Sequence, residues 1–187
     1  HGTYLNRVAT SVPSNECHND FLNGLPLILP SEKVQRLRRI ASQSQIQMRY
    51  SVLNPLIGLP EEEAYYRPGR FPTTGERMQT YQKEALPLAS KAIRDLNLSE
   101  KELQGVTHLI VTSCTGFYAP GLDIEIVRKW NLSPRVRRLL VTYMGCYAAI
   151  SGLRAAQDIV RSHPKARVLM VNLELCSLHL QESALMD

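Results

Sequence analysis

The chain has 187 residues, of which 44% are hydrophobic and 21% are charged, and this globular composition excludes a chain that is disordered throughout. Its net charge of +5 includes 22 dispersed Lys and Arg residues without interleaved aromatic residues, so nucleic acid is not expected as a partner. No apolar run approaches the roughly 18 residues that span a bilayer, and the first residues lack the apolar core of a signal peptide, so we expect a soluble protein without a membrane partner. The four cysteines are far apart in the sequence, and this fits a reducing cytoplasm best.

The first half of the chain contains three predicted elements and one long irregular segment. The pattern predicts a strand over residues 4–13 and a helix over residues 30–42, whose apolar residues fall on one side. The segment 51–75 is rich in Pro, Gly and other turn residues and is expected to be irregular. A long helix is predicted over residues 75–96, interrupted or bent near Pro87 because proline lacks the amide N–H that a helix interior needs.

Strands and helices alternate in the second half of the chain. Strands are predicted at 107–113, 137–143 and 166–175, with helices at 122–130 and 146–162 between them. The three strands are nearly continuous apolar runs, which are typical of strands buried on both faces of a parallel sheet. The alternation predicts an α/β fold, and the absence of a Gly-x-Gly-x-x-Gly motif after any strand argues against a dinucleotide-binding domain.

A cysteine, Cys146, stands where the second of these strands changes to a helix, in the sequence YMGCYAAI (143–150). A helix N-terminus carries unpaired N–H groups and the positive end of the helix dipole, which favour a thiolate and therefore a nucleophile. Gly145 permits a tight turn and leaves room for a substrate carbonyl. A buried structural role is the alternative, because free cysteine is among the most buried residue types. The spacing alone leaves both interpretations open.

The other three cysteines occupy different settings. Cys17 lies in a polar, turn-like stretch beside His18, Cys114 ends a predicted strand, and Cys176 follows one. No two of the four cysteines form a Cys-x-x-Cys pair, so neither a zinc site nor a redox dithiol is indicated. We therefore predict no bound metal.

Several segments occur together in a fixed order: SQIQMRY (44–50), THLIVTS (107–113), PGLD (120–123) and YMGCYAAI (143–150). Through them, the chain from Tyr4 to Gln181 resembles the type III polyketide synthases, the chalcone synthase-like family of thiolase-fold enzymes. The resemblance implies an α/β, thiolase-like fold in which residues 1–187 form the N-terminal half of the family's two-half αβαβα architecture. The C-terminal half is then expected in the same or another chain.

The resemblance implies a catalytic role for Cys146. In that family the matching cysteine accepts a starter acyl group from coenzyme A (CoA) and carries the growing chain while malonyl-CoA is decarboxylated and condensed onto it. Covalent catalysis is therefore expected, with acyl-CoA and malonyl-CoA as substrates and no separate cofactor. A histidine and an asparagine of the family's C-terminal half assist its cysteine. None of the five histidines here matches that histidine, so residues 1–187 alone are expected to be catalytically incomplete.

The resemblance also implies binding residues. Arg36 and Arg39 match basic positions that hold the phosphates of CoA, whereas a third basic position of that cluster is Gln43 here. Further residues match positions that line the substrate cavity: Cys114, Thr115, Ala119, Glu174, Cys176 and His179. At the position of Ala119, relatives carry a methionine that reaches across the dimer, so we expect a homodimer through this loop and extra space for the starter.

Two other functions stay open at this point. A different thiolase-fold enzyme, such as an initiating ketosynthase or a hydroxymethylglutaryl-CoA synthase, would share the nucleophile, although SQIQMRY and YMGCYAAI favour the polyketide synthases. A half-domain that serves only as an acyl-binding or assembly subunit would explain the missing histidine and asparagine.

Overall fold

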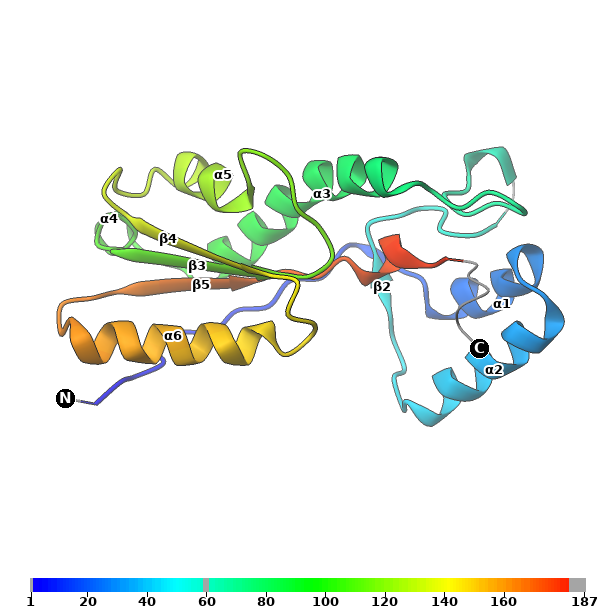
Figure 1. The fold of residues 1–187 in the computed structure, drawn as a ribbon, viewed down its shortest axis with the longest axis horizontal. Coiled ribbons are helices and arrows are strands. Elements are labelled where there is room, and N and C mark those ends of the chain that lie inside the picture. Colours follow the sequence, from blue (N-terminus) through cyan, green and yellow to red (C-terminus); the bar gives the residue numbers. More distant parts are fainter. Residues whose placement is uncertain (1, 59–60, 182–187) are drawn as a thin grey trace. The chain divides into compact units, whose positions relative to one another are not determined.

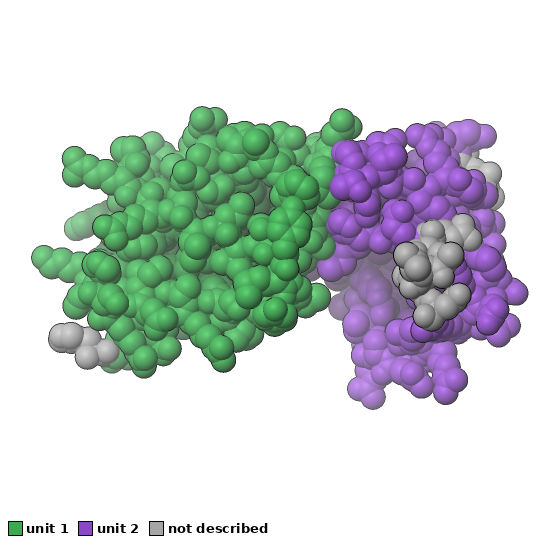
Figure 2. All heavy atoms as spheres, in the orientation of Figure 1, with its two compact units in different colours: residues 1–11, 78–175 green, residues 12–77, 176–187 purple. Residues whose placement is uncertain are grey.

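The structure is a computed structural model that describes residues 2–58 and 61–181. The chain forms two compact units, which Figure 2 colours separately. Unit 1 comprises residues 1–11 and 78–175, and unit 2 comprises residues 12–77 and 176–187. Each unit is therefore assembled from segments that are distant in the sequence.

A three-stranded parallel sheet forms the centre of unit 1, in the order β4, β3, β5 (Figure 1). Strand β3 (His108–Ser113) lies between β4 (Arg137–Thr142) and β5 (Val168–Asn172). Five of the six residues of β3 are buried, because this strand has a neighbour on each side and a helix on each face. The parallel pairing of the three strands confirms the predicted α/β arrangement.

Helices cover the two faces of this sheet (Figure 1). Helix α6 (Ala148–Ser162) packs on one face against β3 and β5, and α5 (Leu122–Lys129) packs on the other. An ion pair ties α5 to the edge strand β4, since Arg138 Nη1 donates to Asp123 Oδ2 at 2.5 Å. Both helices were predicted, although α6 begins two residues later than expected.

The long helix α3 (Thr74–Asp95) supplies further core side chains to unit 1. Its buried residues Tyr81, Ala85 and Ala89 recur every four residues and so lie along one side of the helix. The helix runs through Pro87 without an interruption, which confirms the predicted helix but not a break within it. Its sequence is too polar to cross a membrane, and no other helix in the described part of the chain is long and apolar enough to do so.

A short helix that the sequence pattern did not predict, α4 (Glu100–Gln104), begins at a capping box. The Ser99 hydroxyl accepts a hydrogen bond from the amide N–H of Glu102 at 3.3 Å, and the Glu102 carboxylate accepts one from the Ser99 amide at 2.8 Å. These bonds pair two amide groups that a helix start otherwise leaves open. The hydrogen bonds from Ser99 also lower the pKa of the Glu102 carboxyl group.

We expect Ser99→Ala to lower the free energy of unfolding by about 1 kcal/mol at pH 7, the usual cost of losing an N-cap hydroxyl. Because the pKa of Glu102 is lower in the folded chain than in the unfolded chain, its stabilising effect is present above the unfolded pKa and is lost as the pH falls through the folded pKa. The effect of Ser99→Ala should therefore be smaller at pH 3 than at pH 7. Urea unfolding at both values checks this, with the exposed Ser162→Ala as a control, and a cost independent of pH would contradict it.

The predicted strand over residues 4–13 was wrong, because the structure contains no strand there. The segment is instead held by Arg7, whose Nη1 donates to the carbonyl oxygens of Leu96 at 3.1 Å and Asn97 at 2.6 Å. Its apolar side chains, such as Val8, are exposed. No described strand pairs with this segment, so its backbone forms no sheet hydrogen bonds with them.

Unit 2 is mostly helical and irregular. Its elements are α1 (His18–Ile28), α2 (Ser31–Gln43), the short antiparallel pair β1 (Asn15–Glu16) and β2 (Tyr50–Ser51), and the 3-10 helices η1 (Glu61–Glu63) and η2 (Cys176–His179). Helix α2 confirms the predicted helix, whereas α1 was missed because it contains Gly24 and Pro26, which disfavour a helix. The rest of the segment 51–75 is largely irregular as predicted, except that residues 59 and 60 lie outside the described residues.

Strand β4 and helix α6 expose apolar side chains, so the prediction that every strand is buried on both faces was wrong. Leu139 and Leu140 of β4 are 41% and 43% exposed, and Ile150 and Leu153 of α6 are 54% and 47% exposed. Among the strands of the described residues, β4 lies at the edge of the sheet and has a hydrogen-bonded neighbour, β3, on one side only. These four residues are called the β4–α6 apolar surface below.

Candidate functional site

A turn of five residues, 143–147, joins β4 to α6 and contains Cys146. Two of its residues have a left-handed backbone, Tyr143 with φ 59° and Gly145 with φ 79°. Glycine adopts this conformation without steric cost, whereas it costs roughly 1 kcal/mol at a residue such as Tyr143. The amide of Ala148 donates to the carbonyl oxygen of Gly145 at 3.0 Å and closes the turn. The chain therefore passes from the carboxyl end of a strand to a helix N-terminus within a few residues.

Cys146 lies in this turn with an exposed side chain. It precedes the N-cap residue Tyr147, so it stands at the N-terminus of α6, although the first helical residue is Ala148. The amide N–H groups of Cys146, Tyr147 and Ala149 donate no backbone hydrogen bond within residues 2–58 and 61–181. Open amides at a helix start stabilise negative charge beside them, on a thiolate or on a carbonyl oxygen under attack. The exposed side chain does not fit the alternative of a buried structural cysteine.

The predicted cavity residues Cys114, Thr115 and Glu174 lie together beside this turn. The Glu174 carboxylate accepts hydrogen bonds from the Cys114 amide at 3.0 Å and from the Thr115 hydroxyl at 2.7 Å. The Cys114 thiol donates to the carbonyl oxygen of Gly145 at 3.2 Å. These residues meet because the carboxyl ends of parallel strands lie at one edge of a sheet. Cys114 thus links the loop after β3 to the residue that precedes Cys146.

The loop after β3 packs against Tyr81 of α3, a residue that the sequence analysis missed. The buried Tyr81 hydroxyl donates to the Ser113 hydroxyl at 2.6 Å. Burial raises the pKa of Tyr81 to about 12, so this phenol stays protonated at neutral pH. Gly116 lies over the ring, and a Cβ atom there would come within 2.1 Å of Tyr81 Cγ. Position 116 therefore has no room for a side chain, because the ring of Tyr81 occupies that space. No sequence signal identified Tyr81.

Ala119 lies exposed in the same loop, before a cis peptide bond to Pro120. Nearby, the ring of Phe117 lies 5.4 Å from the ring of Tyr143, measured between centroids, and both side chains are exposed. An exposed aromatic pair therefore connects the Ala119 loop to the Cys146 turn. The cavity role of Ala119 and the homodimer stay predictions.

The remaining predicted site residues lie in unit 2, whereas Cys146 lies in unit 1. Arg36 and Arg39 are exposed on α2, three residues apart and therefore on one side of the helix. Cys176 and His179 lie in η2, where Nδ1 of His179 is 3.1 Å from Nη1 of Arg77. Their placement around one cavity with Cys146 stays a prediction.

Hydrogen bonds within unit 2 fix η2, which carries Cys176 and His179. The Ser177 carbonyl oxygen accepts a bond from the Tyr66 hydroxyl at 2.7 Å, and the Leu180 amide donates to that hydroxyl at 3.0 Å. Burial raises the pKa of Tyr66, which keeps this phenol a donor. The segment after β5 is thus a defined part of unit 2, although its sequence carries no regular pattern.

The two histidines described in unit 1 lie at the amino ends of the strands, whereas Cys146 lies at their carboxyl ends. His108 is the first residue of β3, and His163 follows the last residue of α6. Cys146 instead follows the carboxyl end of β4. A strand rises about 3.3 Å per residue, so the length of β3 separates the two edges by about 20 Å. Neither histidine is placed to assist the Cys146 thiol.

The fold and this site define an α/β protein of the thiolase-like class with a cysteine at a strand-to-helix turn. The family model described as chalcone and stilbene synthases, N-terminal domain, matches residues 12–184. The chain therefore belongs to the chalcone and stilbene synthase family, the type III polyketide synthases, and corresponds to the N-terminal domain of its members. This confirms the family and the thiolase-like fold predicted from the sequence.

Curated relatives are similar over most of this chain. It is 34% identical over 161 residues to the alpha-pyrone synthesis polyketide synthase-like Pks18 of Mycobacterium tuberculosis, which covers 82% of this chain and 38% of the relative. It is 30% identical over 152 residues to type III polyketide synthase 10 of Oryza sativa subsp. japonica, which covers 76% of this chain and 35% of the relative. The chain thus spans less than half the length of these relatives.

Solved structures share the fold. PKS-I from the brown alga Ectocarpus siliculosus has a TM-score of 0.72 and 30% identity, covering 92% of this chain and 48% of its own. CsyB complexed with CoA-SH has a TM-score of 0.75 and 24% identity, covering 92% of this chain and 46% of its own. At 24% identity, the similarity to CsyB shows the fold alone.

Proposed function

We propose that Cys146 is the acyl-accepting nucleophile of a type III polyketide synthase and that acyl-CoA thioesters are its substrates. The observation that carries this proposal is the exposed thiol at the N-terminus of α6, beside the hydrogen bonds that join Cys114 to Glu174. The family membership of residues 12–184 supports the same chemistry.

The first step transfers a starter acyl group to the protein. The Cys146 thiolate attacks the carbonyl carbon of an acyl-CoA, a C–S bond to Cys146 forms, and the bond to the CoA sulfur breaks. The CoA thiolate leaves and takes up a proton. Negative charge moves onto the carbonyl oxygen during the attack, and the open amides at the start of α6 are suited to stabilise it.

The second step lengthens the chain. Loss of CO2 from malonyl-CoA gives the enolate of acetyl-CoA, whose carbon attacks the carbonyl carbon of the Cys146 thioester. The new C–C bond forms, the C–S bond to Cys146 breaks, and the Cys146 thiolate is released. The lengthened chain, now on CoA, returns to Cys146 for another cycle, and cyclisation ends the sequence. The histidine and asparagine that assist these steps are proposed to come from a C-terminal domain, because none of the five histidines matches the family's catalytic histidine. His108 and His163, in addition, lie at the amino ends of the strands, away from Cys146.

Binding of the substrates is assigned to two groups of residues. Arg36 and Arg39, exposed on one side of α2, suit the phosphates of CoA because each guanidinium offers paired donors. Glu174 fixes the loop of Cys114 and Thr115 by accepting from both residues, and it thereby shapes the wall beside the thiol. No metal or bound cofactor enters this proposal.

The β4–α6 apolar surface supports the presence of a further domain. Leu139 and Leu140 lie on opposite faces of β4, and Ile150 and Leu153 lie on the neighbouring helix. The exposure of four large apolar side chains on two neighbouring elements is typical of an interaction surface. We propose that the family's C-terminal domain packs on this surface and brings the assisting histidine and asparagine. The complete enzyme is proposed to be a homodimer, with the Ala119 loop at the contact between subunits.

Intact-mass spectrometry of the complete protein after incubation with an acyl-CoA tests the role of Cys146. We expect one acyl group on the wild type and none on Cys146→Ala. Cys17→Ala is the control, because it removes a cysteine that belongs to no proposed site and should leave the adduct unchanged.

Other outcomes of this experiment point to other functions. An acyl adduct that survives Cys146→Ala would contradict the proposal. Acyl-CoA that binds without a covalent adduct, equally in wild type and Cys146→Ala, would indicate an acyl-binding subunit. An adduct that is extended by malonyl-CoA only once would indicate an initiating ketosynthase instead of an iterative synthase.

A further inference from the structure

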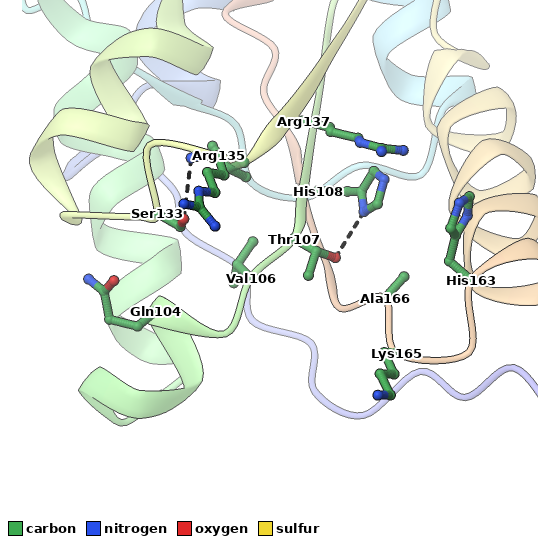
Figure 3. Close-up of a pocket in the computed structure, with 11 residues that line it drawn as sticks. Gln104, Val106, Thr107, His108, Ser133, Arg135, Arg137, His163, Lys165 and Ala166 are labelled. Atoms are coloured by element: carbon green, nitrogen blue, oxygen red, sulfur yellow. Dashed lines mark hydrogen bonds between the residues drawn. The ribbon is translucent and has the colours of Figure 1, made fainter.

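The amino ends of the strands in unit 1 form a hollow of about 330 Å³, at the opposite edge of the sheet from Cys146 (Figure 3). We propose that this hollow binds a small phosphate-bearing anion of the diphosphate class. The residues that carry the argument are Thr107, His108, Arg135, Arg137, His163 and Lys165, and they are called the basic hollow below.

The basic hollow concentrates positive charge without a neutralising carboxylate. Arg135, Arg137 and Lys165 are all exposed at its wall, and none of the residues that line it is Asp or Glu. No salt bridge joins any of these three side chains to a carboxylate in the described part of the chain. Cationic side chains gathered around a concave surface raise the local concentration of anions.

Two histidines add donors to the same surface. The rings of His108 and His163 lie 6.3 Å apart, measured between centroids, and Figure 3 shows Arg137 beside His108. Burial lowers the pKa of His108, and the positive charges of Arg137 and His163 lower it further. The Thr107 hydroxyl lies 2.9 Å from Nδ1 of His108 and fixes the ring. An anion placed between these groups would relieve the repulsion and favour the protonated ring.

The size and charge of the hollow favour a small, multiply charged ligand. Its volume lies at the lower end of the range of ligand sites, which is roughly 300–1,000 Å³. Three cationic side chains match the two or three negative charges of a diphosphate. About 20 Å of strand separates the hollow, at the amino ends of the strands, from Cys146, at their carboxyl ends. Anion binding in the hollow therefore does not depend on the polyketide chemistry proposed for Cys146.

Titration calorimetry of the complete protein with inorganic pyrophosphate at low salt tests the proposal. We expect Arg137→Gln combined with Lys165→Gln to weaken pyrophosphate binding at least about tenfold, because two charge-assisted contacts are lost. Lys83→Gln combined with Arg154→Gln is the matched control, because it removes two exposed cations of unit 1 that do not line the hollow, and it should leave this binding unchanged. A parallel titration with ADP distinguishes a free diphosphate from one that is part of a nucleotide.

The pH dependence gives a second readout. Since the bound anion favours protonated His108, whose ring faces Thr107, Arg137 and His163, the ratio of pyrophosphate affinity at pH 6 to that at pH 8 should be higher in the wild type than in His108→Gln, where the ligand undergoes the same change of charge. His108→Gln should not abolish binding. The proposal is overturned if pyrophosphate does not bind, if binding is unaffected by Arg137→Gln with Lys165→Gln, or if Lys83→Gln with Arg154→Gln weakens it as much. These results would leave the proposed role of Cys146 unchanged.

Discussion

Gly116→Ala is expected to lower the free energy of unfolding by about 3 kcal/mol, the upper end of the usual cost of overpacking. The added methyl carbon would lie 2.1 Å from Cγ of Tyr81 and nearly as close to both neighbouring ring carbons. The ring cannot move away freely, because Tyr81 is buried and its hydroxyl is bonded to Ser113 at 2.6 Å. Urea unfolding followed by circular dichroism measures the change.

Gly75→Ala is the matched control for this prediction. Its added methyl carbon would meet nothing closer than Thr73 Oγ1 at 4.0 Å, and Gly75 lies within α3. Alanine is favoured over glycine in a helix by up to about 1 kcal/mol, so this variant should be slightly stabilised. If the ring of Tyr81 is the cause of the first effect, adding Tyr81→Ala to Gly116→Ala should cost less than the two separate losses summed. Equal effects of the two alanines would contradict the steric explanation.

Arg138→Met is expected to lower the free energy of unfolding by about 2–3 kcal/mol. It leaves the Asp123 carboxylate, which is only 7% exposed, without the guanidinium that donates to it at 2.5 Å. Breaking a buried pair costs roughly 3–5 kcal/mol, and we expect less here because Arg138 is 38% exposed and partly screened by water. Thermal unfolding at neutral pH measures the loss.

A double-mutant cycle separates the ion pair from the packing of the long arginine side chain. Asp123→Asn combined with Arg138→Met removes both charges, and it should be less destabilised than the sum of the two single variants. Arg138→Lys retains the charge and should recover part of the stability, although it loses the planar donor geometry of arginine. Additive effects in the cycle would show that the pair makes no net contribution.

The alternation of strands and helices could be predicted because local patterns determine it. The runs at 107–113, 137–143 and 166–175 are each apolar over several residues, and the strands form there with small shifts at their ends. The same pattern did not reveal that β4 is an edge strand. An apolar run indicates that a strand has buried side chains, but it does not indicate whether another strand pairs with it on each side.

Other elements were missed for different physical reasons. The segment 4–13 has a strand-like composition, but it finds no strand to pair with in the described chain, and Arg7 fixes it through backbone carbonyls instead. Helix α1 forms despite Gly24 and Pro26, with Gly24 buried against Ile57. Tertiary contacts of this kind override local propensity, and no local pattern predicts them.

The position of Cys146 could be predicted locally, whereas its surroundings could not. The sequence YMGCYAAI places a cysteine at the start of a helix, and the structure places it beside the N-cap residue. The bond from Cys114 to Gly145 and the bonds to Glu174 join residues from three strand ends, which only the sheet order brings together. The family resemblance identified Cys114 and Glu174, because it carries information on long-range contacts that periodicity lacks.

On the side of β4 that faces away from β3, no strand of residues 2–58 and 61–181 pairs with its backbone donors and acceptors, and Leu139 and Leu140 of this strand are exposed. Where such a row of donors and acceptors stays unpaired, copies of the chain are prone to associate with one another strand to strand. The yield of folded protein in a cell should therefore depend on chaperones that shelter this edge during synthesis.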